Sequence, residues 1–257
     1  MTARLSYLRP LAVPVLLIAL WQSAAIGLPP HSRTPIPSHV LEVAWQLCAS
    51  GELPSALGLS LTRVLAGFLC AAAISLVLGA AMGYFRSVGR NLDPVIESFR
   101  PIAPIAFLPL AILWFGDGTP AAVFIVAYAA FFPMLISTVH GVRSVDPRLS
   151  DAARTLGVGR LRTLRTVVLP GALPGIFLGV RLGLGGAWTS IIAAELAVGA
   201  KAGEGSSGGI GQMMFVFYAY RVELNGIVVC MITVGLVAFV VDKGVRLLQR
   251  KMMPWTA

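Results

Sequence analysis

Few side chains in this sequence are placed to do chemistry. The three histidines lack the spacing of metal ligands, and the three cysteines are scattered and odd in number, which argues against a disulfide framework. No nucleophile elbow, zincin helix or paired carboxylates are present. We therefore expect neither an active site nor a metal or cofactor site in this chain. The residues concerned are His31, His39, His140, Cys48, Cys70 and Cys230.

One acid lies within an otherwise apolar run. Glu195 occurs in WTSIIAAELAVGA, and an ionised carboxylate inside a membrane is expensive unless it faces a cavity or a partner. Two interpretations stay open: a group on a transport pathway, or a salt bridge to Arg63 on another helix. For an anionic cargo, pairing or gating is favoured over direct contact. Trp188, Trp114 and Phe115 are further candidates for a constriction on that pathway.

The second candidate is DAARTLGVGRLRTLRTVVLP, which holds four arginines and one acid at the middle of the chain. Asp146 and Pro147 supply an N-cap and a proline at the first helical position, and Gly157 ends the first helix. A second apolar stripe follows, and Pro170 is expected to stop the second helix. This predicts a helix–turn–helix, here called the elbow (residues 146–170). The stripes are Leu149, Ala152, Ala153 and Leu156, then Leu161, Leu164 and Val168.

The elements that carry these residues are membrane helices. Of the 257 residues, 57% are hydrophobic and 12% charged, and the mean hydropathy is +0.83, far more apolar than one soluble core of this size needs. Runs of roughly 20 residues, enough to cross the hydrocarbon as helices, recur six times. The expected spans are Leu11–Leu28, Leu57–Phe85, Ile102–Phe115, Ala121–Val139, Ala172–Gly199 and Gly226–Leu247.

Two of these spans have further features. The third contains three prolines in RPIAPIAFLPLAILWFG, which predicts a kinked helix whose freed carbonyls face protein or a wet cavity. The first could instead be a cleaved signal peptide, because arginines precede its apolar core and Ser23-Ala24-Ala25 resembles a cleavage site. Its length and Trp21, a typical interfacial anchor, favour a retained span.

The positive charges predict the orientation. With a cytoplasmic N-terminus, fifteen lysines and arginines fall on the inner side and three on the outer side. The inner set includes Arg86, Arg90 and Arg100, the elbow arginines and the C-terminal cluster. The net charge of +9 thus reflects topology, and no nucleic-acid partner is needed to explain it. Both termini and the elbow are expected in the cytoplasm of a bacterial cell, under its inner membrane.

Small residues recur every fourth position on two spans, as expected of helices that pack closely in lipid. They allow static packing and a sliding gate alike. The ladders are Gly67, Ala71, Ser75, Gly79 and Gly83, and Gly171, Gly175, Gly179, Gly183 and Ala187. Outside the spans, we expect a short amphipathic helix at Val40–Cys48 and a flexible outer loop in GAKAGEGSSGGIG, which either meets a binding protein or serves as a linker.

The elbow's composition alone would favour a loop that touches anionic lipid head groups. Its spacing resembles the EAA motif of ABC importer permeases, in which an acid, two alanines, a glycine and a late Ile-x-Leu-Pro stand at these intervals. Asp replaces Glu here and Val replaces Ile. In that family the elbow is a coupling helix that fits a groove on a cytoplasmic ATPase. The residues that this resemblance assigns to coupling are Asp151, Ala152, Ala153, Gly157, Val167, Leu169 and Pro170.

The resemblance extends from about Ser60 to Trp255 and is to the nitrate/sulfonate/taurine branch of these permeases. It rests on SLTRVLAGF, GVRSVDPRL, VVLPGALPGIFLGVRLGLGGAWTSIIAAEL and LLQRKMMPW. It implies an all-α integral membrane protein with about six helices in the type I importer fold. It also implies a homodimer, two ATPase subunits that hold ATP and magnesium, and an extracytoplasmic substrate-binding protein. None of these partners is encoded here, since no Walker-type phosphate loop is present.

The resemblance divides the chain into residues 1–56 with the first span and an outer segment, a permease core at 57–250 with the coupling loop at 140–170, and a cytoplasmic tail at 251–257. Taurine or another aliphatic sulfonate is the expected cargo, with nitrate, bicarbonate or a pyrimidine precursor as alternatives. Two other classes stay open: a secondary carrier that needs no ATPase, and a membrane scaffold that recruits a cytoplasmic protein.

Overall fold

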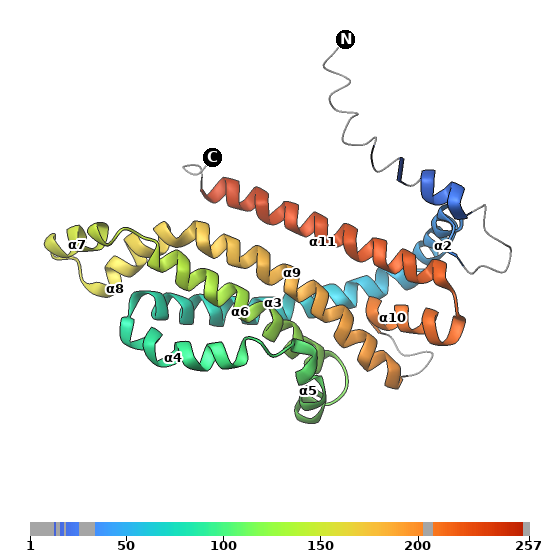
Figure 1. Ribbon diagram of the computed structural model, residues 1–257, viewed down its shortest axis with the longest axis horizontal. Helices are drawn as coiled ribbons and strands as arrows, with labels where there is room; N and C mark the ends of the chain where they lie inside the picture. Colours follow the sequence, from blue (N-terminus) through green and yellow to red (C-terminus); the bar gives the residue numbers. More distant parts are fainter. Residues whose placement is uncertain (1–12, 14–15, 18, 26–33, 203–207, 254–257) are drawn as a thin grey trace, which may run out of the picture.

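A computed structural model describes residues 13, 16–17, 19–25, 34–202 and 208–253, and these residues are almost entirely helical (Figure 1). Two short stretches are π-helical turns, η2 and η3, and one is a 3-10 turn, η1. The elements are α2 (Pro37–Ala49), α3 (Glu52–Tyr84), α4 (Arg86–Phe99), η1 (Pro104–Phe107), α5 (Leu108–Phe115), α6 (Thr119–Arg143), α7 (Pro147–Thr155), α8 (Arg160–Thr163), η2 (Leu164–Val168), α9 (Leu169–Ala202), α10 (Ile210–Val216), η3 (Phe217–Arg221) and α11 (Leu224–Met252).

Helix α6 is the centre of the bundle, because α3 and α9 pack along its two sides (Figure 1). Apolar side chains of α6 such as Ile125, Val126 and Leu135 are completely or almost completely buried. Both small-residue ladders face this helix. A Cβ at Gly79 on α3 would lie 2.8 Å from Thr138 of α6, and one at Gly183 on α9 would lie 2.6 Å from Met134. The ladders therefore provide close packing of α3 and α9 against α6, and a sliding gate stays a prediction.

The closest approach between two backbones in this packing joins α6 to α9 at two glycines. A Cβ added at Gly175 would lie only 2.6 Å from the Cα of Gly141, and one at Gly141 would lie 2.9 Å from the carbonyl oxygen of Ala172. Real Cβ atoms do not approach other atoms this closely, so larger residues would push the two backbones apart. Small residues thus set the interhelical distance.

Four helices are long and apolar enough to cross a membrane in the part of the chain that the structure describes. They are α3, α6, the continuous helix from α8 into α9, and α11. These confirm four of the six expected spans. The first span, Leu11–Leu28, lies largely outside the described residues. The α2 helix confirms the short helix expected at Val40–Cys48.

The third expected span, Ile102–Phe115, is not one kinked helix. It is the turn η1 followed by the eight-residue helix α5, and together they meet α4 at an angle of 85°. The pair α4 and η1–α5 has enough apolar length to count as a fifth, broken span. Pro101 and Pro104 lie at the break: Pro101 has no N–H to continue the hydrogen bonds of α4, and Pro104 follows Ala103, whose backbone is extended with ψ of 134°.

Pro170 does not stop the second helix of the elbow, contrary to the sequence-based expectation. Helix α8 passes through the π-turn η2 directly into α9, in which Pro170 is the second residue. At η2 the N–H of Leu169 donates to the carbonyl of Leu164, five residues back. In this wider turn the proline, which has no N–H, is accommodated at the start of α9, and the elbow becomes a direct extension of a membrane helix.

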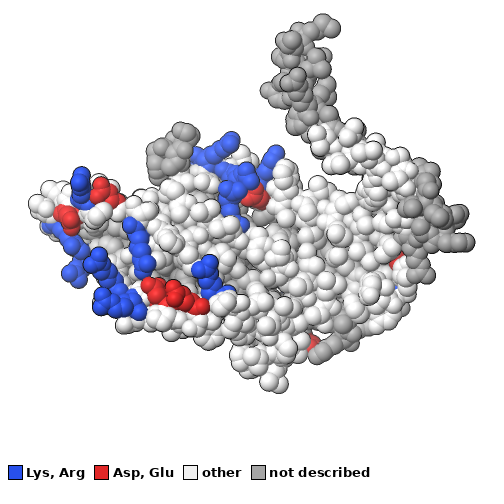
Figure 2. Space-filling model, in the orientation of Figure 1, with Lys and Arg blue, Asp and Glu red and all other residues white. Residues whose placement is uncertain are grey.

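Positive charge collects at one end of the molecule (Figure 2). In this view lysines and arginines gather over the end that carries α7 and α8, over α4 and over the C-terminal part of α11, whereas the opposite half shows almost none. Within the bundle, Arg181 of α9 forms a salt bridge with α11. Its Nε donates to Asp242 of α11 at 3.0 Å, which ties α11 to α9.

The packing of α6 against α9 gives a first prediction. Gly175→Ala should destabilise the protein by about 1–3 kcal/mol, because the added methyl group collides with the backbone of Gly141. Gly185→Ala on the same helix is the matched control: nothing lies within 4 Å of its added Cβ, and alanine is the better helix former. Unfolding midpoints of the purified protein in detergent measure both. Equal midpoints for the two variants would contradict the close-packing account.

Candidate functional site

The first helix of the elbow, α7, is capped by hydrogen bonds at both ends. At the start, the Asp146 carboxylate accepts a hydrogen bond from the N–H of Arg148 at 2.9 Å, which confirms the predicted N-cap. At the end, the N–H of Val158 donates to the carbonyl of Ala153 at 3.0 Å, and that of Gly157 donates to Arg154 at 2.9 Å. Gly157 has φ of +77°. This is a Schellman motif, which glycine allows because it has no Cβ.

The elbow presents apolar side chains that nothing in the described part of the chain covers. Leu156 is 82% exposed, and Leu149 and Leu161 are also more than half exposed. Ala152 is exposed beside them, whereas Ala153 is buried against the chain itself. Of the two alanines assigned to coupling, only Ala152 is thus free to meet a partner from this side.

The second helix of the elbow, α8 with the turn η2, packs against the bundle. Leu164 and Val168 are buried together with Val142 of α6 and Ala172 of α9. Val167 and Leu169 are half-buried in the same part of the elbow, and Pro170 is exposed. This packing joins the second helix of the elbow to both α6 and α9. Asp151 is exposed and lies 3.9 Å from Arg154, a loose pair of little energetic weight.

Glu195 occupies a buried polar cluster at the opposite end of α9 from the elbow. Its carboxylate forms a salt bridge with the Nη1 of Arg63 at 2.9 Å. The two residues are 2% and 9% exposed, and they join α9 to α3. The salt bridge that the sequence left as an alternative is present. The Nε of Arg63 also donates to the hydroxyl of Thr119, at the start of α6, at 3.1 Å.

The carboxylate has further donors. The Ser60 hydroxyl lies 2.9 and 2.8 Å from its two oxygens and itself accepts from the N–H of Ile210 at 2.8 Å. The N–H of Gly211 donates to Oε2 at 3.0 Å. We call Ser60, Arg63, Thr119, Glu195 and these two amides the Glu195 cluster. Because both oxygens of the Glu195 carboxylate accept hydrogen bonds from the protein, the geometry favours pairing over direct contact with a cargo.

The segment before α10 closes over this cluster. A side chain at Gly209 would overlap the Glu195 carboxylate, and a Cβ at Gly211 would lie 2.7 Å from the Cβ of Glu195. The sequence predicted a flexible outer loop here. Residues 203–207 of that loop lie outside the described residues, but Gly208 to Gly211 pack tightly and are part of the cluster. Glycine is required because the chain must approach the carboxylate closely.

The aromatic candidates lie in different surroundings. Trp188 is buried in the core and lines a pocket of about 400 Å³ between α9 and α11. Trp114 and Phe115 are exposed at the end of α5 and pack edge-on or tilted against Phe124, with ring centroids 6.2 and 5.6 Å away. That these three residues line one constriction stays a prediction.

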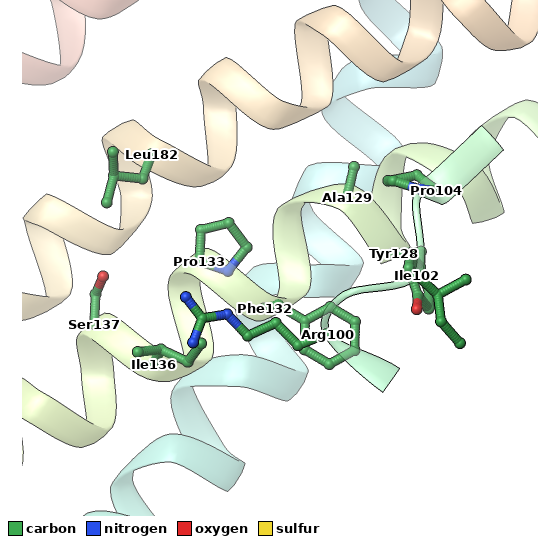
Figure 3. A pocket seen from close by; sticks show the side chains of 10 residues that line it. All are labelled: Arg100, Ile102, Pro104, Tyr128, Ala129, Phe132, Pro133, Ile136, Ser137 and Leu182. Atoms are coloured by element: carbon green, nitrogen blue, oxygen red, sulfur yellow. The ribbon is translucent and has the colours of Figure 1, made fainter. Parts of the chain in front are cut away.

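Arg100 is a functional candidate that the sequence analysis did not identify. It was counted only among the charges of the inner side, and its side chain lines a pocket of about 370 Å³ against the central turns of α6 and against α9 (Figure 3). We call this the Arg100 pocket, lined chiefly by Arg100, Tyr128, Phe132, Ile136, Ser137 and Leu182. No sequence signal indicated the pocket, because it depends on α4 folding back along the bundle from the end where Arg86 starts the helix (Figure 1).

Comparisons with known proteins are specific. Residues 55–254 match the family described as binding-protein-dependent transport system inner membrane component. The taurine transport system permease protein TauC of Escherichia coli (strain K12) is 36% identical over 246 residues, which cover 94% of this chain and 86% of the relative. The bicarbonate transport system permease protein CmpB of Synechococcus elongatus is 38% identical over 192 residues, which cover 74% of this chain and 66% of the relative.

Among solved structures, an inward-facing conformation of the MetNI methionine ABC transporter resembles this chain with a TM-score of 0.66 and 17% identity. The alignment covers 78% of this chain and 96% of that chain. At this identity the likeness concerns the fold.

The Glu195 cluster gives the second prediction. Glu195→Ala should destabilise the protein by about 3–5 kcal/mol, because it leaves the buried Arg63 without its counter-charge. The double variant Arg63→Met with Glu195→Met should recover most of this loss, since it buries no lone charge. Asp151→Ala, which removes an exposed pair, should cost less than about 1 kcal/mol. Unfolding midpoints measure all three, and a double variant as unstable as Glu195→Ala would refute the pairing account.

Proposed function

We propose, from the premise that this chain belongs to the family of binding-protein-dependent transport system inner membrane components, that it moves a small anion inward, with taurine or another aliphatic sulfonate as first choice. The chain is a membrane-embedded permease subunit of an ABC importer, and its fold is that of the type I permeases. It is not an enzyme, because ATP hydrolysis belongs to a separate subunit. Family membership therefore replaces the carrier and scaffold interpretations.

The elbow is the observation that carries the coupling proposal. Its first helix, α7, presents Leu156 and Ala152 at the surface, and beyond the turn at Gly157 its second helix, α8, continues through η2 into α9. A cytoplasmic ATPase that covers these side chains would therefore act on a membrane helix through one tight turn. The far part of that helix holds Glu195, which is tied to α3 and α10. Movement at the elbow would thus reach the opposite face through one helix, as alternating access requires.

The assembly follows from this role. An ABC importer permease works with ATPase subunits and a substrate-binding protein. Our proposal adds that two copies of this chain form a homodimer, and that ATP and magnesium are held by the ATPase partner alone. The positively charged end of the molecule, which includes the elbow, would face the cytoplasm (Figure 2). With that orientation the Glu195 cluster lies toward the outer face of the bacterial inner membrane.

The extent of the two matches favours the sulfonate. The taurine permease aligns over 94% of this chain, whereas the bicarbonate permease aligns over 74%. Both names describe carriers of small solutes with an anionic group. Bicarbonate is therefore the second choice, and nitrate or a pyrimidine precursor follows.

The cargo can be tested in cells. A strain that lacks this gene should fail to grow on taurine as the sole sulfur source and should grow normally on sulfate. The intact gene should restore growth on taurine. If growth on the two sources is equal, the sulfonate proposal fails and bicarbonate uptake is measured next.

Coupling through the elbow can be tested at its turn. Gly157→Val should abolish uptake while membrane insertion stays normal, because a β-branched side chain at a φ of +77° costs about 1–2 kcal/mol and re-aims α7. Gly159→Val is the matched control: its backbone is extended, with φ of −66° and ψ of 154°, and nothing lies within 4 Å of the added Cβ. Labelled-substrate uptake and quantitative membrane blots measure the pair. Uptake by Gly157→Val at the level of Gly159→Val would contradict a role for the turn.

A further inference from the structure

Arg100 sits at the break of the broken span, where α4 ends and the chain bends by 85° into η1 and α5. Its side chain runs along α6 from Phe132 toward Ile136 (Figure 3). The guanidinium end lies beside Ile136, which is seven residues from the elbow end of the 25-residue helix α6, or roughly 10 Å at 1.5 Å per residue. Arg100 is an exposed residue, and its guanidinium lies alongside α6 and not beyond the end of that helix.

The charge of Arg100 has no ion-pair partner among the described residues. None of the six salt bridges found there includes this side chain. A cation at this depth is expensive unless it faces a wet cavity or an anion. Arg63 differs from Arg100, because Glu195 neutralises its charge. Arg100 is thus available to pair with an anion from outside the chain.

The walls of the Arg100 pocket fit a small solute with an anionic head. Its volume of about 370 Å³ falls in the range of small-molecule sites, roughly 300–1,000 Å³. Phe132, Ile136 and Leu182 supply apolar surface, and Ser137 adds a hydroxyl from α6. The Tyr128 hydroxyl is already used, since it donates to the carbonyl of Phe99 at 2.7 Å and thereby holds the end of α4 against α6.

The position of the Arg100 pocket also suits a transport pathway along α6. A second hollow of about 180 Å³ follows it along α6 toward the elbow end, and Arg100 and Ile136 line both. Its other polar walls are Asp93 and Glu97 of α4 and His140 and Arg143 of α6, of which Asp93 and Arg143 pair at 3.5 Å. Arg100 thus stands between two hollows arranged along one helix.

We propose that Arg100 is the residue by which the permease itself recognises its cargo: its guanidinium holds the anionic group in the pocket at the break between α4 and α5. This inference rests on the proposed function. A sulfonate or carbonate offers oxygen atoms that match the planar fork of a guanidinium, so arginine suits this role better than lysine. Selectivity for anions then resides in this chain as well as in the binding protein, and broken helices commonly build such sites in transporters.

The first test does not depend on which cargo is carried. In a chain whose Cys48, Cys70 and Cys230 are replaced by serine, Ser137→Cys places a thiol in the pocket. The thiol is labelled in the assembled complex with two methanethiosulfonates of similar size, one bearing a sulfonate and one a quaternary ammonium. With Arg100 present, the sulfonate reagent should react faster than the cationic one. Arg100→Gln should reduce the ratio of the two rates by about tenfold, the loss expected of one charge-assisted contact.

Arg90→Gln is the matched control, because Arg90 is exposed like Arg100 and carries the same charge on α4 but lines neither hollow. It should leave the ratio unchanged. If Arg100 only packs against α6, Arg100→Gln will also leave the ratio unchanged and will alter at most the unfolding midpoint. That result overturns the proposal. A ratio that falls equally in Arg90→Gln and Arg100→Gln reports general surface charge and overturns it as well.

The second test uses transport. In proteoliposomes that contain the permease, its ATPase and its binding protein, Arg100→Gln should lower taurine uptake by tenfold or more, and Arg100→Lys should retain more of it. Arg90→Gln should transport at the rate of the unaltered chain. If the unaltered complex does not carry taurine but the labelling ratio depends on Arg100, the cargo assignment fails and anion recognition stands. If taurine is carried equally well by Arg100→Gln, the cargo assignment stands and the recognition role fails.

Discussion

The close fit of α6 between α3 and α9 is the constraint on which the other features depend. In lipid, helices gain nothing by hiding apolar surface from water, so they associate through contacts that only a short interhelical distance provides. The small residues facing α6 create that distance on both sides, down to the contact between Gly141 and Gly175. Once three helices are held this closely, groups at their ends are set in register: Arg63 meets Glu195, and Leu164 meets Val142.

The bundle therefore has two differently built ends joined by α9. At one end the elbow presents apolar side chains that the described part of the chain leaves uncovered, and its second helix continues into α9 through a π-turn. At the other end the Glu195 cluster binds α9 to α3, α6 and the start of α10, and both oxygens of the carboxylate accept hydrogen bonds. Between them lies the Arg100 pocket, and none of the salt bridges among the described residues includes Arg100. In the proposed function the elbow meets the ATPase and this pocket binds the cargo, while the Glu195 cluster holds the helices together at the far end.

Much of this architecture could be predicted from the sequence, and what could not be has physical causes. Hydropathy identifies α3, α6, α9 and α11, and the cap at Asp146 and the turn at Gly157 follow from local rules. The pairing of Arg63 with Glu195 could be suggested because two charges in apolar runs need partners. Ser60 and the amide of Ile210 could not, since these groups are 150 residues apart and carry no charge pattern. The Arg100 pocket could not be predicted either, because charge counting along the chain does not reveal that α4 folds back beside α6.

The separation of Arg63 and Glu195 along the chain also bears on how the protein is made. The two residues are 132 positions apart, so α3 enters the membrane long before its counter-charge has been synthesised. An arginine in a membrane helix is costly to insert, by up to about 2.5–3.5 kcal/mol when it lies at the helix centre. The 33-residue length and strong hydropathy of α3 offset that cost, and the charge is neutralised only when α9 arrives. The buried pair thus makes completion of the bundle, not insertion of any one helix, the step at which both charges become stable in the membrane.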